Sequence, residues 1–423
     1  MKSYLFGLLF VWFNFAYCSS ERKCCCKCCA CCCCYSGAPG SRGSLVIPEI
    51  KADFISFDEF SGYFNSADIN KGPINEKIDE LNNTLYSVKS LIGGRLNTKN
   101  FLGRSYSFPH IHWNGSIPDK HKNACYMLAP LNIILHLYCI MEFFKSDRVP
   151  IRVVNDSSDC YRFFEDIAFI RIFRIYVNAL EIGESFTLDI GKNGDYYFTL
   201  GLAGKADVYD DNAMDVIEKT FGTIKKFRNC PLIYEFNLHS EYMSDFDNEV
   251  DWDGKDPYDF VETFDCKDFC DRFCKKMDKD HDPCNYDILF FHLQELCRVK
   301  DKPVTIKVGK EEKNADNYFE PKPIKNLTES FECGENKYFL KGLLFWAAGD
   351  KRLSYDSAND YFSIVYDKNA PDKSKPYVYC QLNRPLKYYS LRDIEDGINK
   401  MDRSEFPYKY NYLAGLFYEK VTA

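Results

Sequence analysis

The chain has 423 residues, of which 46% are hydrophobic, 16% aromatic and 27% charged. This composition excludes a wholly disordered chain, a collagen-like repeat and a polytopic membrane protein. The net charge of −8 provides no basic field for phosphates, so we expect no nucleic-acid partner. The bulk of the chain is therefore expected to fold as an aromatic-rich globule.

Residues 1–18 have the pattern of a secretory signal peptide. A basic Lys2 precedes an apolar run from Tyr4 to Tyr17, and the small residues Ala16 and Cys18 stand before a cleavage point after Cys18. The run is shorter than the roughly 20 residues of a spanning helix. We therefore expect entry into the secretory pathway, with secretion or export to another cell, and no stable membrane span apart from the signal peptide.

Residues 19–46 form a cysteine-rich, low-complexity segment, with nine cysteines between Cys24 and Cys34. Such a tract can bind soft metal ions, form intermolecular disulfides, or carry acyl chains if it faces the cytosol. It lacks the spaced cysteine pairs of a zinc site, so a segment with no defined site is the alternative interpretation.

Residues 47–103 are interpreted as an N-terminal extension that contains an amphipathic helix. Apolar residues recur at helical spacing from Ile74 to Leu91, and Gly93 and Gly94 end the pattern. We expect this helix to pack on the following domain, because the pattern is too short for a coiled coil between chains.

The rest of the chain predicts helices first and strands later. A buried helix is expected within 123–144 and a second helix at 211–221. Short β-type runs follow at 232–238, 287–293, 304–308, 337–347, 360–367, 377–382 and 412–421. This order predicts the α+β class with an antiparallel sheet.

Cys125 lies at the start of the long apolar helix. A helix N-terminus stabilises a thiolate and so favours a nucleophile. A free cysteine is also a common small core residue, so this position alone does not indicate catalysis.

Five segments in the same order resemble the motifs of the ubiquitin-specific proteases, which are papain-like deubiquitinases. The cysteine box of that family is similar to Asn123-Ala124-Cys125-Tyr126-Met127. The other four segments are Asp210–Val216, Asp287–Leu293, Asn359–Ile364 and Leu416–Lys420. The resemblance covers residues 104–421 and implies the family's papain-like fold, with a helical thumb, β fingers and an antiparallel β palm, and ubiquitin or a ubiquitin-like protein as the partner.

The resemblance places Cys125 at the nucleophile position and Asp360 where the family has its catalytic histidine. No histidine follows position 292. A thiol protease needs a downstream imidazole to take the proton of the thiol and return it to the leaving amine. An aspartate, with an ordinary pKa near 4, is a poor base for a thiol.

The remaining site positions depart from the family as well. Depending on the register, the residue that would orient the histidine is Gln381 or Asn383, and Lys120 stands at the position that donates to the oxyanion. A lysine stabilises an anion only as a mobile point charge.

Structural zinc is not expected, and no cofactor is predicted. The first zinc knuckle of the family is broken after Cys230. Cys266, Cys270 and Cys274 repeat every four residues, which indicates one helix face instead of a tetrahedral site.

The sequence thus predicts an exported, ubiquitin-hydrolase-like protein, degenerate in catalysis, that acts as a ubiquitin-binding module. One alternative is an active thiol-dependent deubiquitinase in which His110, His112 or His121 replaces the missing base. A second alternative is a structural secreted protein in which the cysteine tract is the functional part.

Overall fold

The chain divides into two units, residues 1–48 and 49–423, and every residue described below belongs to the second. The computed structural model describes residues 56, 58, 75–83, 85–86, 108–113, 125–145, 160–183, 185–188, 213–227, 233–237, 263–280, 286–299, 304–308, 311–315, 318–348, 360–380, 386–400 and 410–421. The predicted signal peptide and the cysteine-rich segment lie outside these residues.

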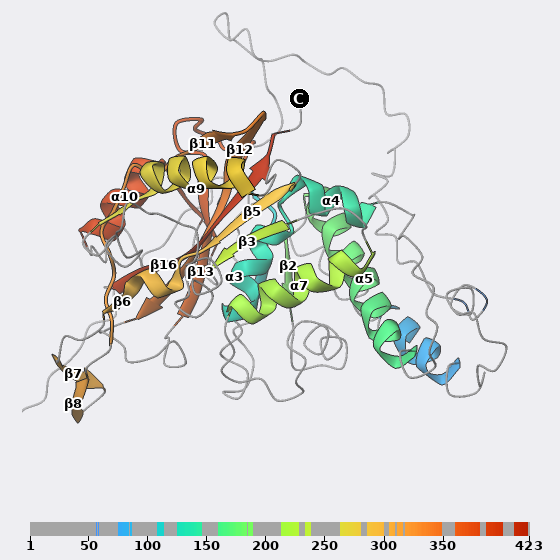
Figure 1. Cartoon of the computed structure of the whole chain (residues 1–423). Coiled ribbons are helices and arrows are strands. Elements are labelled where there is room, and N and C mark those ends of the chain that lie inside the picture. Colours follow the sequence, from blue (N-terminus) through green and yellow to red (C-terminus); the bar gives the residue numbers. More distant parts are fainter. Residues whose placement is uncertain are drawn as a thin grey trace, which may run out of the picture. The chain divides into compact units, whose positions relative to one another are not determined.

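The centre of the second unit is an eight-stranded sheet (Figure 1). Seven strands follow one another in the order β15 (Lys387–Tyr389), β14 (Tyr377–Cys380), β13 (Asp360–Tyr366), β12 (Asn336–Ala348), β16 (Tyr410–Lys420), β5 (Ile288–His292) and β3 (Ile233–Asn237), and β11 (Ser330–Cys333) pairs with β12. All neighbours are antiparallel except β3 and β5, which run parallel. The α+β class with an antiparallel sheet is therefore confirmed, with one parallel pair at its edge.

Both faces of this sheet are buried along much of the central strands, where apolar residues stand at consecutive positions. On β5, Ile288 and Phe290 point into one core and Leu289 and Phe291 into the other. β16 alternates in the same way. A strand buried on both sides needs apolar residues at consecutive positions, so it requires a layer of helices on each face.

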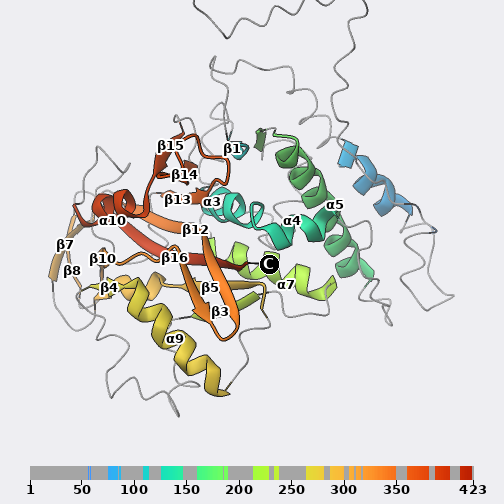
Figure 2. The same ribbon diagram turned by 90° about the horizontal axis from the view of Figure 1, so that it is seen from above.

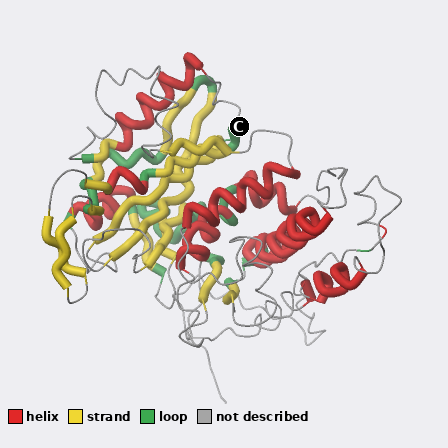
Figure 3. Tube along the Cα trace, turned by 60° about the horizontal axis from the view of Figure 1, so that its bottom comes forward, coloured by secondary structure: helices red, strands yellow, loops and turns green. Residues whose placement is uncertain are grey.

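Helices flank the sheet (Figure 3), and the two helical layers come from different parts of the chain (Figure 2). One core holds residues of α3 (Cys125–Ile134), α4 (Tyr138–Lys145), α5 (Cys160–Glu181) and α7 (Ala213–Phe227). The opposite core holds residues of α9 (Cys266–Asp280) and α10 (Leu391–Asn399). The thiols on α9 at positions 266, 270 and 274 are all buried there, which confirms that they share one helix face.

The buried helix predicted within 123–144 is present as α3, but it does not continue through the region, because α3 and α4 meet at an angle of 85°. The carbonyl of Asn132 would ordinarily accept the backbone N–H of His136, but it lies 2.7 Å from Nδ1 of the His136 ring. The backbone N–H of His136 donates to Ile133 instead, at 3.0 Å. This tighter turn ends α3 and lets α4 leave in a new direction while Leu137 and Ile140 stay buried.

The predicted amphipathic helix is present over residues 75–83 and 85–86. Its residues Ile78, Leu81 and Leu85 are buried in the same core as α3. The expected packing on the following domain is confirmed for these three residues, and the rest of the predicted pattern lies outside the described residues.

The remaining described elements are short. They are β1 (Ile111–Trp113), β2 (Phe186–Leu188), β4 (Phe264–Asp265), η5 (Gln294–Cys297), β6 (Arg298–Val299), β7 (Val304–Val308), β8 (Glu311–Ala315), β9 (Tyr318–Phe319) and β10 (Ile324–Lys325). In the described part of the chain, no single helix has the length and apolar character to cross a membrane, and only the bent pair of α3 and α4 together meets those criteria.

Candidate functional site

Cys125 is the first residue of α3 and is half-buried. The nine residues that follow it in the helix are all buried, because α3 packs against β13 and β12 on one side and α7 on another. The approach to β12 is close: a Cβ atom at Gly342 would overlap the side chain of Ile133. The apolar surface of α3 and this glycine therefore fix the position of the helix that presents Cys125.

The structure brings Asp360 to Cys125. Asp360 begins β13, and its carboxylate forms a hydrogen bond with the Cys125 thiol. Two backbone N–H groups, those of Tyr361 and Tyr126, also donate to the sulfur. Asp360 and Cys125 thus lie next to each other, although 235 residues separate them in the sequence.

This environment favours the thiol over the thiolate. Burial raises the pKa of the Cys125 thiol well above its ordinary range, and the neighbouring negative charge of Asp360 raises it further. The two backbone donors lower the pKa but do not outweigh these effects. In the hydrogen bond the thiol is the donor, since an ionised carboxylate only accepts. At neutral pH Cys125 is therefore a protonated thiol.

Three other sequence-predicted positions lie outside the described residues: Lys120, Gln381 and Asn383. The structure therefore does not describe the expected oxyanion and orienting groups. Among the described residues, the sequence did not indicate the hydrogen bond from the Tyr361 N–H to the Cys125 sulfur, because a backbone donor carries no sequence signal.

The histidines considered as replacement bases are not placed at Cys125 by any described contact. His110 lies in the segment that leads into β1, and its Nδ1 is 2.7 Å from the carbonyl oxygen of Phe108. The next residue, Ile111, is bonded through both its N–H and its carbonyl to the Asn132 side chain. Asn132 is seven residues along α3 from Cys125, which is roughly 10 Å at about 1.5 Å per residue. The His112 side chain and all of His121 lie outside the described residues.

His292 is buried at the end of β5, with Nε2 3.3 Å from Oε1 of Gln294. It lies on the strand that pairs with β3 and β16. Of the buried thiols on α9, Cys266 lies 3.5 Å from the Tyr418 hydroxyl. No group of three or more His, Cys, Asp or Glu side chains within the described ranges has the arrangement of a metal site.

No family model matches the sequence, and no curated protein does. Among solved structures, the chain is similar to one described as the crystal structure of an essential yeast splicing factor. The identity is 12%, the alignment covers 80% of this chain and 78% of that chain, and the TM-score is 0.42. A likeness at this level establishes neither a shared family nor a shared function.

Proposed function

We propose that this chain is a catalytically degenerate protein of the ubiquitin-specific protease type, which binds ubiquitin or a ubiquitin-like protein without cleaving it. The observation that carries the proposal is the hydrogen bond between the Cys125 thiol and the Asp360 carboxylate. In an active thiol hydrolase of this type an imidazole occupies that place and accepts the proton. Here the neighbour is an anion that stabilises the protonated thiol.

The arrangement of the resembling segments supports the papain-like part of the proposal. The cysteine helix α3 packs against β13, which carries Asp360, and against α7, which carries the second motif. The third and fifth motifs lie on β5 and β16, which are paired neighbours with Phe290 opposite Phe417. The described parts of these five segments thus lie on α3, α7 and one sheet, and all five contribute residues to one hydrophobic core.

The loss of activity is tested with ubiquitin that carries a C-terminal electrophile. We expect Cys125 to react no faster than a free cysteine at the same pH. The matched variant is Asp360→His, which replaces the anion by an imidazole, and we expect it to raise the labelling rate of Cys125 because the like charge is removed and a base is supplied. Rapid labelling of the unaltered protein that is lost in Cys125→Ala would overturn the proposal.

The binding part is tested separately by titrating isotopically labelled ubiquitin with the full chain and following its amide resonances. We expect saturable shifts that are the same for the unaltered protein and for Cys125→Ala. If ubiquitin and ubiquitin-like proteins all fail to bind, the binding function is wrong even if the lack of activity is correct. The proposed secretory localisation rests on residues 1–18 alone.

A further inference from the structure

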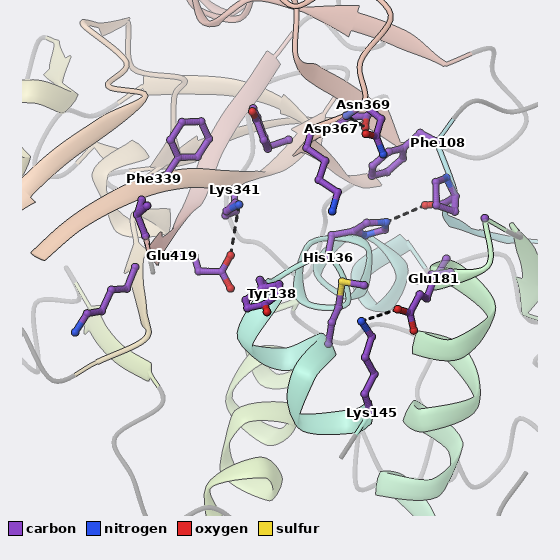
Figure 4. Close-up of a pocket in the computed structure, with 18 residues that line it drawn as sticks. Phe108, His136, Tyr138, Lys145, Glu181, Phe339, Lys341, Asp367, Asn369 and Glu419 are labelled. Atoms are coloured by element: carbon purple, nitrogen blue, oxygen red, sulfur yellow. Dashed lines mark hydrogen bonds and ion pairs between the residues drawn. The ribbon is translucent and has the colours of Figure 1, made fainter. Parts of the chain in front are cut away.

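A pocket of about 800 Å³ lies near the end of β13 that is remote from Cys125 (Figure 4). Its walls come from the α3–α4 turn, from α4, from the end of α5, and from β12, β13 and β16 with the residues that follow them. Asp360 begins β13 and Asp367 follows its last residue. Seven residues of strand span roughly 23 Å at about 3.3 Å per residue, so this pocket is separate from the cysteine site.

One wall of the pocket offers fixed, flat surfaces. The rings of Phe108 and His136 are stacked, with centroids 4.5 Å apart and an interplanar angle of 23°. The ring nitrogens of His136 face the carbonyl oxygens of Asn132, at 2.7 Å, and Pro109, at 2.9 Å. A neutral imidazole donates through only one of these nitrogens. Both nitrogens nevertheless point at protein carbonyls, so this wall interacts with a ligand through ring surfaces. Met141 and Leu180 add aliphatic surface.

The acidic side chains of the pocket are already engaged by the protein. Glu419 is buried, lies 3.5 Å from Nζ of Lys341, and accepts the backbone N–H of Cys139. The Lys341 ammonium also lies 5.4 Å from the Phe339 ring and 5.3 Å from the Tyr366 ring. These contacts hold the Lys341 side chain in a defined place at the pocket wall.

The other two acidic groups are held in the same way. Glu181 pairs with Lys145 at 2.7 Å, as Figure 4 shows. Asp367 is buried; one of its oxygens accepts the N–H of Asn369 at 2.8 Å and the other accepts the Tyr388 hydroxyl at 3.0 Å. None of the three carboxylates is therefore presented to a ligand without a partner of its own.

The charge of the lining is opposite in sign to that of the whole chain. Four lysines and three carboxylates line the pocket, which leaves an excess of one positive charge in a chain of net charge −8. The lysines are Lys145, Lys341, Lys368 and Lys420, and the acidic residues are Glu181, Asp367 and Glu419. Lys368 is exposed and forms no ion pair with another described residue. A local positive excess beside flat apolar walls selects an anion that carries a ring.

We propose that this pocket binds a small organic anion with a planar ring system, with the ring against the wall of Phe108 and His136 and the negative group toward Lys368. The ligand class follows from the charge excess and the stacked wall. This site is independent of the proposed function at Cys125, because no residue of the pocket contacts the Cys125 thiol among the described interactions.

The test uses two fluorescent probes with the same rings, the anion 8-anilinonaphthalene-1-sulfonate and the neutral N-phenyl-1-naphthylamine. We expect the anion to bind the full chain saturably at one site, and the neutral probe to bind at least fivefold more weakly. Lys368→Glu should weaken binding of the anion roughly tenfold and leave binding of the neutral probe unchanged. Lys267→Glu makes the same charge change on α9, on the opposite face of the sheet, and should leave both affinities unchanged.

Four results would overturn the proposal. Equal affinity for the two probes would show a merely apolar pocket. If Lys368→Glu and Lys267→Glu weaken anion binding equally, the effect comes from the net charge of the protein. If neither variant weakens it, the anion binds elsewhere. Failure of the anion to bind at millimolar concentration would exclude the site, and circular dichroism of each variant checks that the fold is intact.

Discussion

The Glu419 carboxylate accepts a hydrogen bond of 2.8 Å from the backbone N–H of Cys139. Glu419 lies near the end of β16 and Cys139 lies in the first turn of α4, so this contact joins the last strand of the sheet to the helical layer. The first backbone N–H groups of a helix have no partner within the helix. A buried acidic residue of the last strand therefore stabilises the start of α4, and Lys341 balances its charge.

We predict that Glu419→Ala lowers the free energy of unfolding by about 2–4 kcal/mol, because a buried helix N–H loses its acceptor and Lys341 loses its carboxylate. Glu419→Gln keeps an acceptor oxygen and should cost about half as much. Urea denaturation measures both. Glu332→Ala, at the exposed position of β11, is the control, and a loss in Glu419→Ala no larger than in this control would contradict the assignment.

The second prediction concerns the reactivity of Cys125. Because burial and Asp360 hold the pKa of this thiol above its ordinary range, alkylation by iodoacetamide should keep accelerating between pH 7 and pH 9 without a plateau near the ordinary thiol pKa of about 8.5. Asp360→Asn removes the negative charge and should raise the rate at pH 7.5 by roughly tenfold, which is the effect of one pKa unit.

Cys139, a second half-buried thiol, is the internal reference for this measurement, because peptide mass spectrometry reads both residues in one sample. Its rate should not change in Asp360→Asn. If the rates at Cys125 are the same with and without Asp360, the contact between the two side chains has no influence on the thiol.

Two asparagines form a matched pair for the third prediction. Asn132 on α3 bonds both the N–H and the carbonyl of Ile111, at 2.9 and 3.2 Å. Asn399 on α10 bonds both groups of Ile324, at 2.8 and 2.7 Å. Asn132 is buried and Asn399 is exposed. Both isoleucines are buried, but the bonds of Asn399 are only partly buried, so water replaces the lost bonds more readily in Asn399→Ala.

We predict that Asn132→Ala costs about 2–3 kcal/mol of unfolding free energy and Asn399→Ala about 1 kcal/mol. Chemical denaturation followed by circular dichroism compares the two variants directly. Equal costs would show that burial does not decide the value of these bonds here.

The fourth prediction is a pH dependence at the start of α9. Burial opposes ionisation of Asp265, but the Asp268 N–H, the Asn326 amide and Lys325 outweigh it and hold the pKa of Asp265 below its ordinary value. A folded-state pKa below the unfolded value stabilises the protein above the unfolded pKa, and this stabilisation is lost as the pH falls through the folded pKa.

Asp265→Asn should therefore be less stable than the unaltered protein at pH 7 by about 0.5–1 kcal/mol, since the amide keeps the cap but loses the charge. The difference should shrink from about pH 4 downward. Thermal unfolding of both proteins from pH 7 to pH 3 measures it. A difference that grows on acidification would have the wrong sign for a lowered pKa.

Several features of the fold were predictable from local sequence. The runs at 287–293 and 412–421 are strands because β-branched, aromatic and aliphatic residues follow one another between polar ends. Helix α5 was not predicted: its apolar residues lie on all sides instead of one face, so the sequence carries no clear helical period. The bend at His136 was missed because it depends on a side-chain bond that competes with the helix backbone.

The sequence by itself determined that no histidine follows position 292 and that Cys125 begins an apolar helix, since both depend only on residue identity and local pattern. The tertiary structure decided that Asp360 meets the Cys125 thiol, and that several distant segments enclose a pocket with a positive excess. Strand pairing and helix packing set these neighbourhoods, and they join residues that are hundreds of positions apart. The position of an electrostatic partner is therefore a property of the fold, not of sequence spacing.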